Sequence, residues 1–378
     1  MRYPDDVPVL TEGTVTLRAH REDDLGGMYE QCIDPVSQRF TSVPVPYTRA
    51  EAQTFLDSRR TAWEKDQHWS FAIESEWGVG PSGFSGSIGL RHHAPGLAEI
   101  GFGAHPTARG HGVTTRAVKL LADWAFGEQG IRTIRWQAQV GNTASRRVAW
   151  KTGFTFEGAS RSSLVQRGVL HDAWRATLLA TDTREPKTRW LDTPTLDGDR
   201  VRLRPLRPDD VQRYLETNND PETLVWLGTI PFPHDSERFH RHLARASTGP
   251  SEGASVEWAM AEVGRDEYVG TVTLFGMTGL DYKSAEVGYR THPDSRGKGF
   301  LKEALRLAIG HAFTPGEDGG IGLERISLNA GADNEGSLRA ARACGFTETG
   351  RDRQCYDLYD GSVVDLIRFD LLRSEYAG

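Results

Sequence analysis

The sequence predicts an α+β protein of two similar domains in tandem, each a twisted, mixed, mostly antiparallel sheet flanked by helices. Two observations indicate this architecture. The chain has 378 residues, which suits two domains of roughly 180 residues better than one. It also repeats one succession of strand and helix patterns. We therefore expect a first domain over residues 1–182, a linker over 183–198 and a second domain over 199–378.

Short segments recur in the same order along the two halves. Residues 13–18 (GTVTLR) recur as 199–204 (DRVRLR), and residues 98–102 (AEIGF) recur as 285–289 (AEVGY). Further pairs, first copy before second, are Asp34 and Asp220, His105 and His292, Asn142 and Asn334, Ser145 and Ser337, and Gly153 and Gly345. The period of about 190 residues has the length of a domain, which indicates duplication of a whole domain rather than a solenoid.

Each copy contains the same expected elements in order. An alternating strand (15–18; 201–204) leads into helices opened by acidic capping residues (21–24; 207–210). Three strands follow, at 69–73, 85–90 and 99–104 and at 258–263, 269–275 and 286–291. After a glycine loop comes a helix whose apolar residues in the first copy are Val113, Ala117, Leu120, Leu121, Trp124 and Ala125. A strand (133–138; 325–329), a short helix and a hairpin complete each copy, a pattern typical of an α+β sheet.

Composition and charge exclude several classes of protein. No run of 18 apolar residues occurs, so we expect no membrane span and a cytoplasmic protein. The first 183 residues carry 20 basic and 20 acidic side chains, which places the whole net charge of −7 in the remainder. That surface disfavours nucleic acid, and it either aids solubility or favours cationic partners such as amines. The three cysteines lack metal-type spacing. We expect no metal, and surface or loop positions for His240 and His242.

A glycine loop follows a strand ending in His-Pro and opens the next helix in both copies. It reads Arg109-Gly110-His111-Gly112 in the first and Arg296-Gly297-Lys298-Gly299 in the second. Backbone N–H groups of such a loop point outward and the helix dipole adds partial positive charge, so the geometry suits a pyrophosphate. The glycines allow close approach of a phosphate, and the arginines and Lys298 add positive charge. A tight turn that only caps the helix is the alternative.

Together these elements resemble the Gcn5-related N-acetyltransferases (GNAT), particularly the branch of ribosomal-protein alanine acetyltransferases. The resemblance spans almost all of both copies and rests on residues 98–102 and 285–289, the two loops, residues 142–145 and 334–337, and the Gly-Phe pairs at 153–154 and 345–346. It implies transfer of an acetyl or other short acyl group from coenzyme A to a primary amine. The amine belongs to a small molecule or to a peptide N-terminus. The family's loop carries Gln or Arg where this chain has Thr107 and Asp294.

The resemblance also implies roles for individual residues. Glu99 and Glu286 take the place of the carboxylate that deprotonates the amine, and Ser145 and Ser337 that of a serine able to return a proton. Backbone N–H groups near the strand end hold the thioester carbonyl, and the asparagines bind the pantetheine arm. The expected coenzyme-binding residues are Ala104, His105, Arg109, Gly110, His111, Gly112, Val113, Thr114, Asn142 and Ser145 in the first copy, and Thr291, His292, Arg296, Gly297, Lys298, Gly299, Phe300, Leu301, Asn334 and Ser337 in the second.

Several roles have alternatives. Because side chains alternate faces, either glutamate is otherwise an exposed strand residue. The serines otherwise cap the short helix or contact the pantetheine arm, and the asparagines otherwise form turns. A tyrosine that many relatives use as general acid is replaced by Ala149 and Ala341. No cysteine lies beside the strand or the loop, so we expect direct attack in a ternary complex.

The acceptor walls are expected around residues 44–47 and 230–234 and near Leu164 and Tyr356, where the copies differ. We expect a monomer or a homodimer. The alternative function is a coenzyme A-binding regulatory or scaffold protein in which one or both copies are catalytically silent, because a fold does not guarantee an activity.

Overall fold

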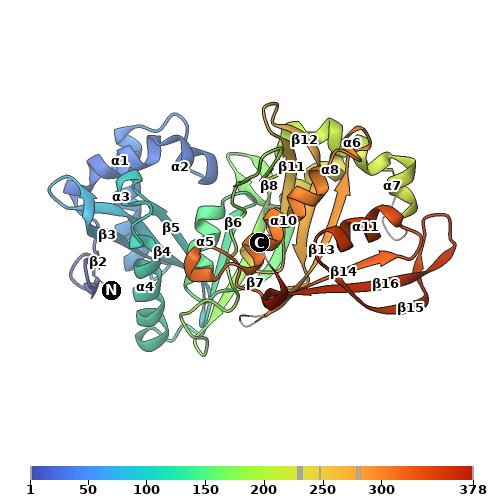
Figure 1. Cartoon of the computed structure of the whole chain (residues 1–378). Helices are drawn as coiled ribbons and strands as arrows, with labels where there is room; N and C mark the ends of the chain where they lie inside the picture. The colour runs from blue at the N-terminus through green and yellow to red at the C-terminus, as the bar shows by residue number, and fades with distance from the viewer. Residues whose placement is uncertain (1, 228–232, 247, 278–279, 281, 377–378) are drawn as a thin grey trace. The chain divides into compact units, whose positions relative to one another are not determined.

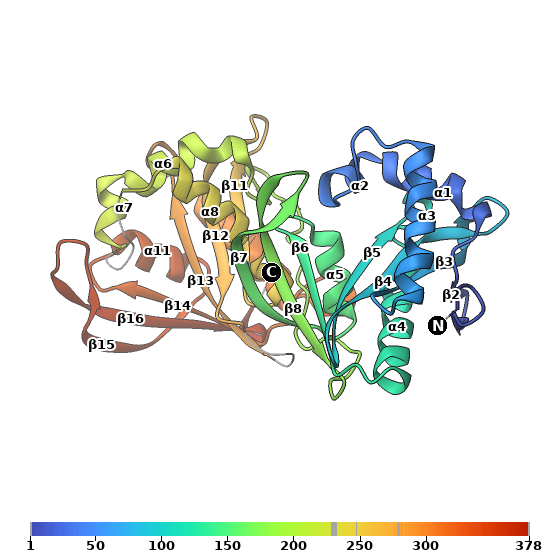
Figure 2. The same ribbon diagram turned by 180° about the vertical axis from the view of Figure 1, so that it is seen from behind.

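The computed structural model describes residues 2–227, 233–246, 248–277, 280 and 282–376. The chain divides into two compact units, Met1–Lys187 and Thr188–Gly378. Each unit contains one eight-stranded mixed sheet with helices packed against it (Figures 1 and 2). The predicted α+β class with two tandem sheet-and-helix domains is confirmed.

The sheet of the first unit has the strand order β1-β2-β3-β4-β5-β6-β8-β7 and is antiparallel except for the pair β5 and β6. Its strands are β1 Leu10–Glu12, β2 Val15–Arg18, β3 His68–Val79, β4 Phe84–Ala94, β5 Leu97–Ala104, β6 Thr133–Gln139, β7 Thr155–Gln166 and β8 Val169–Leu179. Its α-helices are α1 Leu25–Ile33, α2 Pro35–Phe40, α3 Arg49–Glu64, α4 Val113–Glu128 and α5 Thr143–Lys151.

The second unit repeats this topology, with the order β15-β16-β14-β13-β12-β11-β10-β9 and a parallel pair of β13 and β14. Its strands are β9 Leu196–Asp197, β10 Val201–Arg204, β11 Val256–Glu262, β12 Glu267–Phe275, β13 Ser284–Thr291, β14 Arg325–Gly331, β15 Thr347–Asp357 and β16 Val363–Leu372. Its α-helices among the described residues are α6 Val211–Asn219, α7 Pro221–Val225, α8 Ser236–Ala246, α9 Gly249–Glu252, α10 Phe300–Phe313 and α11 Glu335–Ala343.

The helix after the glycine loop buries the main core of each unit. In the first unit, α4 packs Ala117, Leu121 and Ala125 against the sheet, and α10 does the same in the second. These residues recur at helical spacing, so the predicted apolar face is the face that packs. Smaller cores lie under α1 and α3, around Met28, and under α6 and α8, around Phe239.

The segment between the two sheets is packed at several points. Arg184 donates to Asp123 at 3.1 Å in the first unit. In the second unit the backbone N–H of Leu191 donates to the Pro250 carbonyl at 2.8 Å, and the Leu191 side chain is buried in the main core. β9 then pairs with β10. Most of this segment therefore belongs to one unit or the other rather than forming a free tether.

A buried arginine-aspartate pair occupies the same place in both units. Arg18 donates to Asp24 at 2.9 and 2.8 Å, and Arg204 donates to Asp210 at 2.8 and 2.7 Å. The four side chains are at most 4% exposed. Each aspartate also accepts the backbone N–H three residues before it, at the start of the helical layer. The predicted acidic capping residues are thus confirmed. The same carboxylates bind the arginines that end β2 and β10, and so hold these strands to the helical layer.

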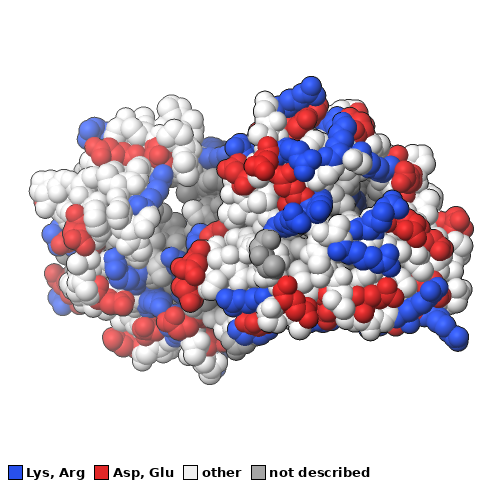
Figure 3. Space-filling model, viewed as in Figure 1, with Lys and Arg blue, Asp and Glu red and all other residues white. Residues whose placement is uncertain are grey.

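The surface carries mixed charge. Basic and acidic side chains are interspersed over the face drawn in Figure 3. Among the described residues, no helix is both long and apolar enough to cross a bilayer.

Candidate active site

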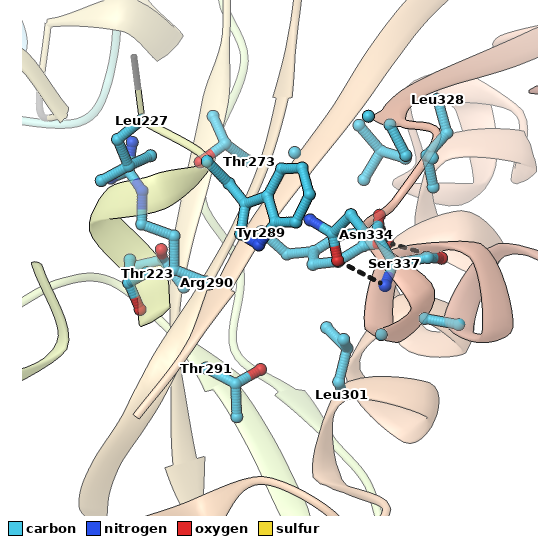
Figure 4. Close-up of a pocket in the computed structure, with 18 of the residues that line it drawn as sticks. Thr223, Leu227, Thr273, Tyr289, Arg290, Thr291, Leu301, Leu328, Asn334 and Ser337 are labelled. Carbon is cyan, nitrogen blue, oxygen red and sulfur yellow. Dashed lines mark hydrogen bonds between the residues drawn. The ribbon is translucent and has the colours of Figure 1, made fainter. Parts of the chain in front are cut away.

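Each sheet opens between its two parallel strands. β5 pairs with β6 from Leu97 to Glu99, and β13 pairs with β14 from Ser284 to Glu286. The pairing then ends, although both strands continue. In the second unit a cavity of about 1030 Å³ lies at this opening, and its lining includes β13, β14, the glycine loop, α7 and the start of α11 (Figure 4).

The glycine loops have the backbone that an anion site requires. Gly110 and Gly112 have φ of 83° and 73°, and Gly297 and Gly299 have φ of 72° and 84°, a left-handed region that side chains disfavour. Gly112 and Gly299 are the N-caps of α4 and α10, and no side chain caps either helix. The first N–H groups of each helix therefore lack an intrahelical partner and point at the open end. A coenzyme A pyrophosphate fits both loops.

The loop arginines hold the loops to the helical layer. Arg109 donates to Asp34 at 2.7 Å and to the Ser37 hydroxyl at 3.1 Å, and Arg296 binds Asp220 and the Thr223 hydroxyl in the same way. Burial raises the pKa of Asp220, but the hydrogen bonds from Arg296 and from the Thr223 backbone, together with the Arg296 charge, hold that pKa below its usual value. The arginine charge predicted for the phosphates is thus already neutralised, which leaves the backbone N–H groups, with Lys298 in the second loop, as the anion donors.

The histidines before the loops are structural. His105 lies between Glu30 and Thr107, and His292 lies between Glu216 and Asp294. Their backbone N–H groups donate to the carbonyls of Ser85 and Val269, both at 2.9 Å. The predicted contact of these two amides with a thioester carbonyl conflicts with that pairing, because each N–H is already used within the sheet. Ala104 and Thr291 are the last residues of β5 and β13, and Thr291 lines the cavity.

The remaining predicted loop residues differ in exposure. Val113 and Phe300 are 1% and 6% exposed and pack in the cores. They can therefore contact a ligand through their backbone N–H groups rather than their side chains. Leu301 lines the cavity (Figure 4), and Thr114, its counterpart, is partly buried. His111 stacks on Trp77 with ring centroids 3.8 Å apart. Its counterpart Lys298 is exposed.

The asparagines, rather than the serines, cap the short helices. Asn142 accepts the backbone N–H of Ser145 at 3.2 Å, and Asn334 accepts that of Ser337 at 3.0 Å. The capping alternative for the serines was therefore wrong. Each serine hydroxyl is hydrogen-bonded elsewhere, to the Trp136 indole N–H at 3.1 Å in the first unit and to the Tyr289 hydroxyl at 2.8 Å in the second.

Tyr289 is a hydroxyl that the sequence analysis missed. It lies on β13 and lines the cavity with Ser337 and Asn334 (Figure 4). Burial raises the pKa of Tyr289 to about 12, so its hydroxyl keeps its proton at neutral pH. The counterpart in the first copy is Phe102, because the motif reads AEIGF there and AEVGY in the second. That single difference was the available signal.

The two predicted bases lie where the parallel strands separate. Glu99 accepts from the Gln137 amide at 3.3 Å, and His93 lies 3.7 Å away. Glu286 faces Phe275 across β12 and β13 and precedes Val287, where the cavity lining on β13 begins. Both side chains are partly buried. The structure therefore brings Glu286 to the edge of the cavity rather than into its centre.

A second carboxylate lies within the cavity. Glu257 on β11 is 11% exposed, and it binds His242 at 2.7 Å and the Thr273 hydroxyl at 3.3 Å. All three residues line the cavity. The expected surface position of His242 was wrong, since this histidine faces the sheet. A charged residue at position 257, before the apolar residues 258–261 of the strand, was the signal for this pair. Tyr356 also lines the cavity, whereas residues 230–232 lie outside the described residues.

The same sheet face is filled differently in the first unit. Strand register aligns Ser70, Gly89 and Gly103 with Glu257, Thr273 and Arg290. A Cβ at Gly89 would lie 2.5 Å from His68, and one at Gly103 would lie 2.8 Å from Gln31. In the first unit a serine and two glycines therefore replace the three cleft residues of the second unit, and the His68 and Gln31 side chains lie beside those glycines.

Acid is expected to destabilise the first unit through His20. Burial lowers the pKa of His20 to about 4, against about 6.5 in an unfolded chain. The folded state favours the neutral ring, so this stability is complete above pH 6.5 and is lost as the pH falls through 4. We expect a loss of about 3 kcal/mol over that range. Urea unfolding at pH 7 and pH 4 checks it: His20→Gln should reduce the pH dependence and His93→Gln should not, and equal slopes in all three would refute the assignment.

The fold and the site define an α+β protein with a glycine loop suited to an anion at a split sheet. A family model described as "Acetyltransferase (GNAT) domain" matches residues 14–155 and 200–347. The chain belongs to the GNAT acetyltransferase family and is an N-acetyltransferase with one such domain in each unit.

Individual relatives match one half of the chain. The chain is 29% identical over 185 residues to "Uncharacterized N-acetyltransferase p20" of Bacillus licheniformis. This alignment covers 49% of this chain and 99% of the relative. It is 37% identical over 187 residues to "Putative ribosomal N-acetyltransferase YdaF" of Bacillus subtilis (strain 168), covering 48% of this chain and 96% of the relative. Among solved structures, Mycobacterium smegmatis RimJ in complex with CoA-disulfide aligns with a TM-score of 0.44 and 21% identity, over 49% of this chain and 90% of that one.

Proposed function

We propose that the chain transfers an acetyl or other short acyl group from acyl-CoA to a primary amine, and that the second unit binds the amine. The observation that carries this proposal is one continuous cavity. Its lining includes Gly297 and Gly299 of the loop, Ser337 on α11 and Glu257 on β11. Direct transfer requires that both substrates meet in one space with their reacting atoms in contact, and this cavity offers that space.

The loop end of the cavity suits the donor. Acetyl-CoA, when bound, supplies a thioester activated for attack by an amine. The free N–H groups at the start of α10 would hold its pyrophosphate. The Asn334 side chain uses its oxygen as a helix cap, which leaves its amide N–H groups for the pantetheine arm. We assign the same donor role to the loop and Asn142 of the first unit.

The strand end suits the chemistry. Glu286, at the edge of the cavity, would accept a proton from the acceptor ammonium, directly or through water, so that the neutral amine can attack. The hydrogen-bonded Tyr289 and Ser337 hydroxyls line the same cavity and would give a proton to the departing thiolate. No cysteine takes part in this scheme, which is direct attack in a ternary complex.

The name of one relative favours one class of acceptor amine. One of them is named a ribosomal N-acetyltransferase, which supports a protein or peptide N-terminal amine as the acceptor, in the cytoplasm. A small amine is the other candidate.

A second candidate role applies to the first unit alone. Its loop has the same backbone as that of the second unit, but His68 and Gln31 occupy the cleft face, and Phe102 replaces Tyr289. These contacts favour a first unit that binds acyl-CoA and turns over more slowly than the second, or not at all.

Removing the Tyr289 hydroxyl tests the proposed function. With acetyl-CoA and peptides with N-terminal Ala or Ser, thiol release should show turnover by the intact chain. Tyr289→Phe should lower kcat about 10- to 100-fold, because general acid catalysis contributes at this scale, and should change the KM for acetyl-CoA less than threefold. Tyr282→Phe removes another buried tyrosine hydroxyl of this unit and serves as control. An unchanged kcat in Tyr289→Phe would eliminate this role, and no turnover on any amine would eliminate the transfer.

A further inference from the structure

Arg290 is a cation in the cleft of the second unit. It lies on β13, partly buried, and lines the cavity. In Figure 4 it lies on the side of Thr223 and Leu227, while Asn334 and Ser337 lie on the other side of Tyr289. Among the residues that the structure describes, its guanidinium has no hydrogen bond or ion pair. Arg204, Arg213 and Arg296 of the same unit each bind a carboxylate.

The surrounding groups do not neutralise Arg290. Glu257 is already bound by His242 and Thr273. Other carboxylates that line the cavity are Glu222, which pairs with Arg296, and Asp357. The other groups that Arg290 influences include tyrosines of α6, β12 and β15 and a histidine. Burial raises the pKa of Tyr214 to about 12 against the opposing charge of Arg290, and burial, with Arg238 and Arg290, lowers the pKa of His234 to about 4. A guanidinium stays charged at all physiological pH values. A partly desolvated charge without a counter-ion is costly, so the cleft favours an anion at this point.

The fold does not require this arginine. The first unit builds the same sheet with Gly103 at the equivalent register position, where Gln31 takes the space. Arg290 also lies on the sheet face opposite the main core, the face shared with Glu257 and Thr273. Leu301, in the first turn of the helix that the loop opens, lies below Ser337 in Figure 4 and not on the side of Leu227. Arg290 is therefore placed for the acceptor rather than for the coenzyme phosphates.

We propose that Arg290 binds a carboxylate of the acceptor, so that the second unit prefers primary amines that carry a carboxylate near the reacting nitrogen. This inference rests on the proposed function and adds the substrate class. The planar guanidinium offers two parallel N–H donors that match a carboxylate. The carboxylate has two possible sources, an acidic side chain next to a peptide N-terminus and the carboxyl group of a free amino acid.

Paired acceptors test this preference on the full chain with acetyl-CoA. The tetrapeptide amides SEAA and SQAA differ by one carboxylate, and so do free glutamine and glutamine amide. We expect kcat/KM to be about 10- to 100-fold higher for the charged member of one pair, the scale of a charge-assisted hydrogen bond. The pair that shows the preference identifies the source of the carboxylate.

The variant Arg290→Gln should remove that preference through the KM of the charged acceptor, and leave SQAA within threefold of the intact chain. Arg265→Gln, at an arginine whose side chain is 75% exposed, should behave as the intact chain. An Arg290→Gln chain that keeps the preference would overturn the proposal, as would a rise in the KM for acetyl-CoA that is equal for both acceptors. Failure of the intact chain to acetylate any amine, with coenzyme bound, would instead overturn the proposed function, and this assignment with it.

Discussion

Asp210→Ala should destabilise the second unit by about 3–5 kcal/mol in free energy of unfolding. Arg204 and Asp210 are both almost fully buried and joined by two hydrogen bonds. Removing the carboxylate leaves the guanidinium charged, buried and short of its main partner. It also frees the backbone N–H of Arg207, which Asp210 accepts at 2.8 Å. The expected loss is large because an uncompensated buried charge costs more than the pair itself contributes.

Urea unfolding measures this loss. The matched control is Asp197→Ala, which removes an aspartate from Arg202 where both side chains are well exposed. Exposed pairs contribute at most about 1 kcal/mol, so the control should unfold nearly as the intact chain does. A loss below about 1 kcal/mol in Asp210→Ala would contradict the structural role of the buried pair.

Gly297→Trp should lower kcat/KM for acetyl-CoA at least about 100-fold, a loss of about 2.7 kcal/mol. Gly297 has φ of 72° and open space where a Cβ would point. A tryptophan there strains the backbone by about 1–2 kcal/mol and places an indole in the path of the pyrophosphate. Steady-state kinetics at varied acetyl-CoA concentration gives the value.

Gly264→Trp separates the two causes. Gly264 also has positive φ, 93°, and open space around it, but it lies in the turn between β11 and β12, away from the cavity lining. Its variant should keep kcat/KM within threefold. Equal losses in both variants would mean that backbone strain, rather than a blocked coenzyme site, explains the effect.

Local sequence patterns were sufficient for the fold. Alternation at Val15–Arg18 and helical spacing in α4 each reflect the face that an element buries, so they can be read without knowing its neighbours. Repetition of these patterns in the same order, about 190 residues apart, then predicted the two sheets. The glycine loops were equally local, because a left-handed turn before a helix selects glycine whatever surrounds it.

The sequence was sufficient to locate the candidate site but not to predict the contacts among its side chains. Arg109 binds Asp34, which lies 75 positions earlier in the chain. The charge of Arg109 is therefore neutralised by a contact that no local pattern predicts. His242 and Glu257 meet only because α8 packs over β11. The serine hydroxyl of each copy has a partner from another strand, Trp136 in one and Tyr289 in the other. Such pairings depend on tertiary packing, which sequence periodicity does not encode.

Counting acetyl-CoA sites by titration calorimetry tests the central claim most directly, since that claim is one coenzyme loop in each of two units. The intact chain should bind two equivalents, and Gly110→Trp and Gly297→Trp should bind one each. Gly168→Trp, at an equally open positive-φ glycine between β7 and β8, should still bind two. The chain with both loop substitutions should bind none, and undiminished binding by that folded double variant would contradict the account.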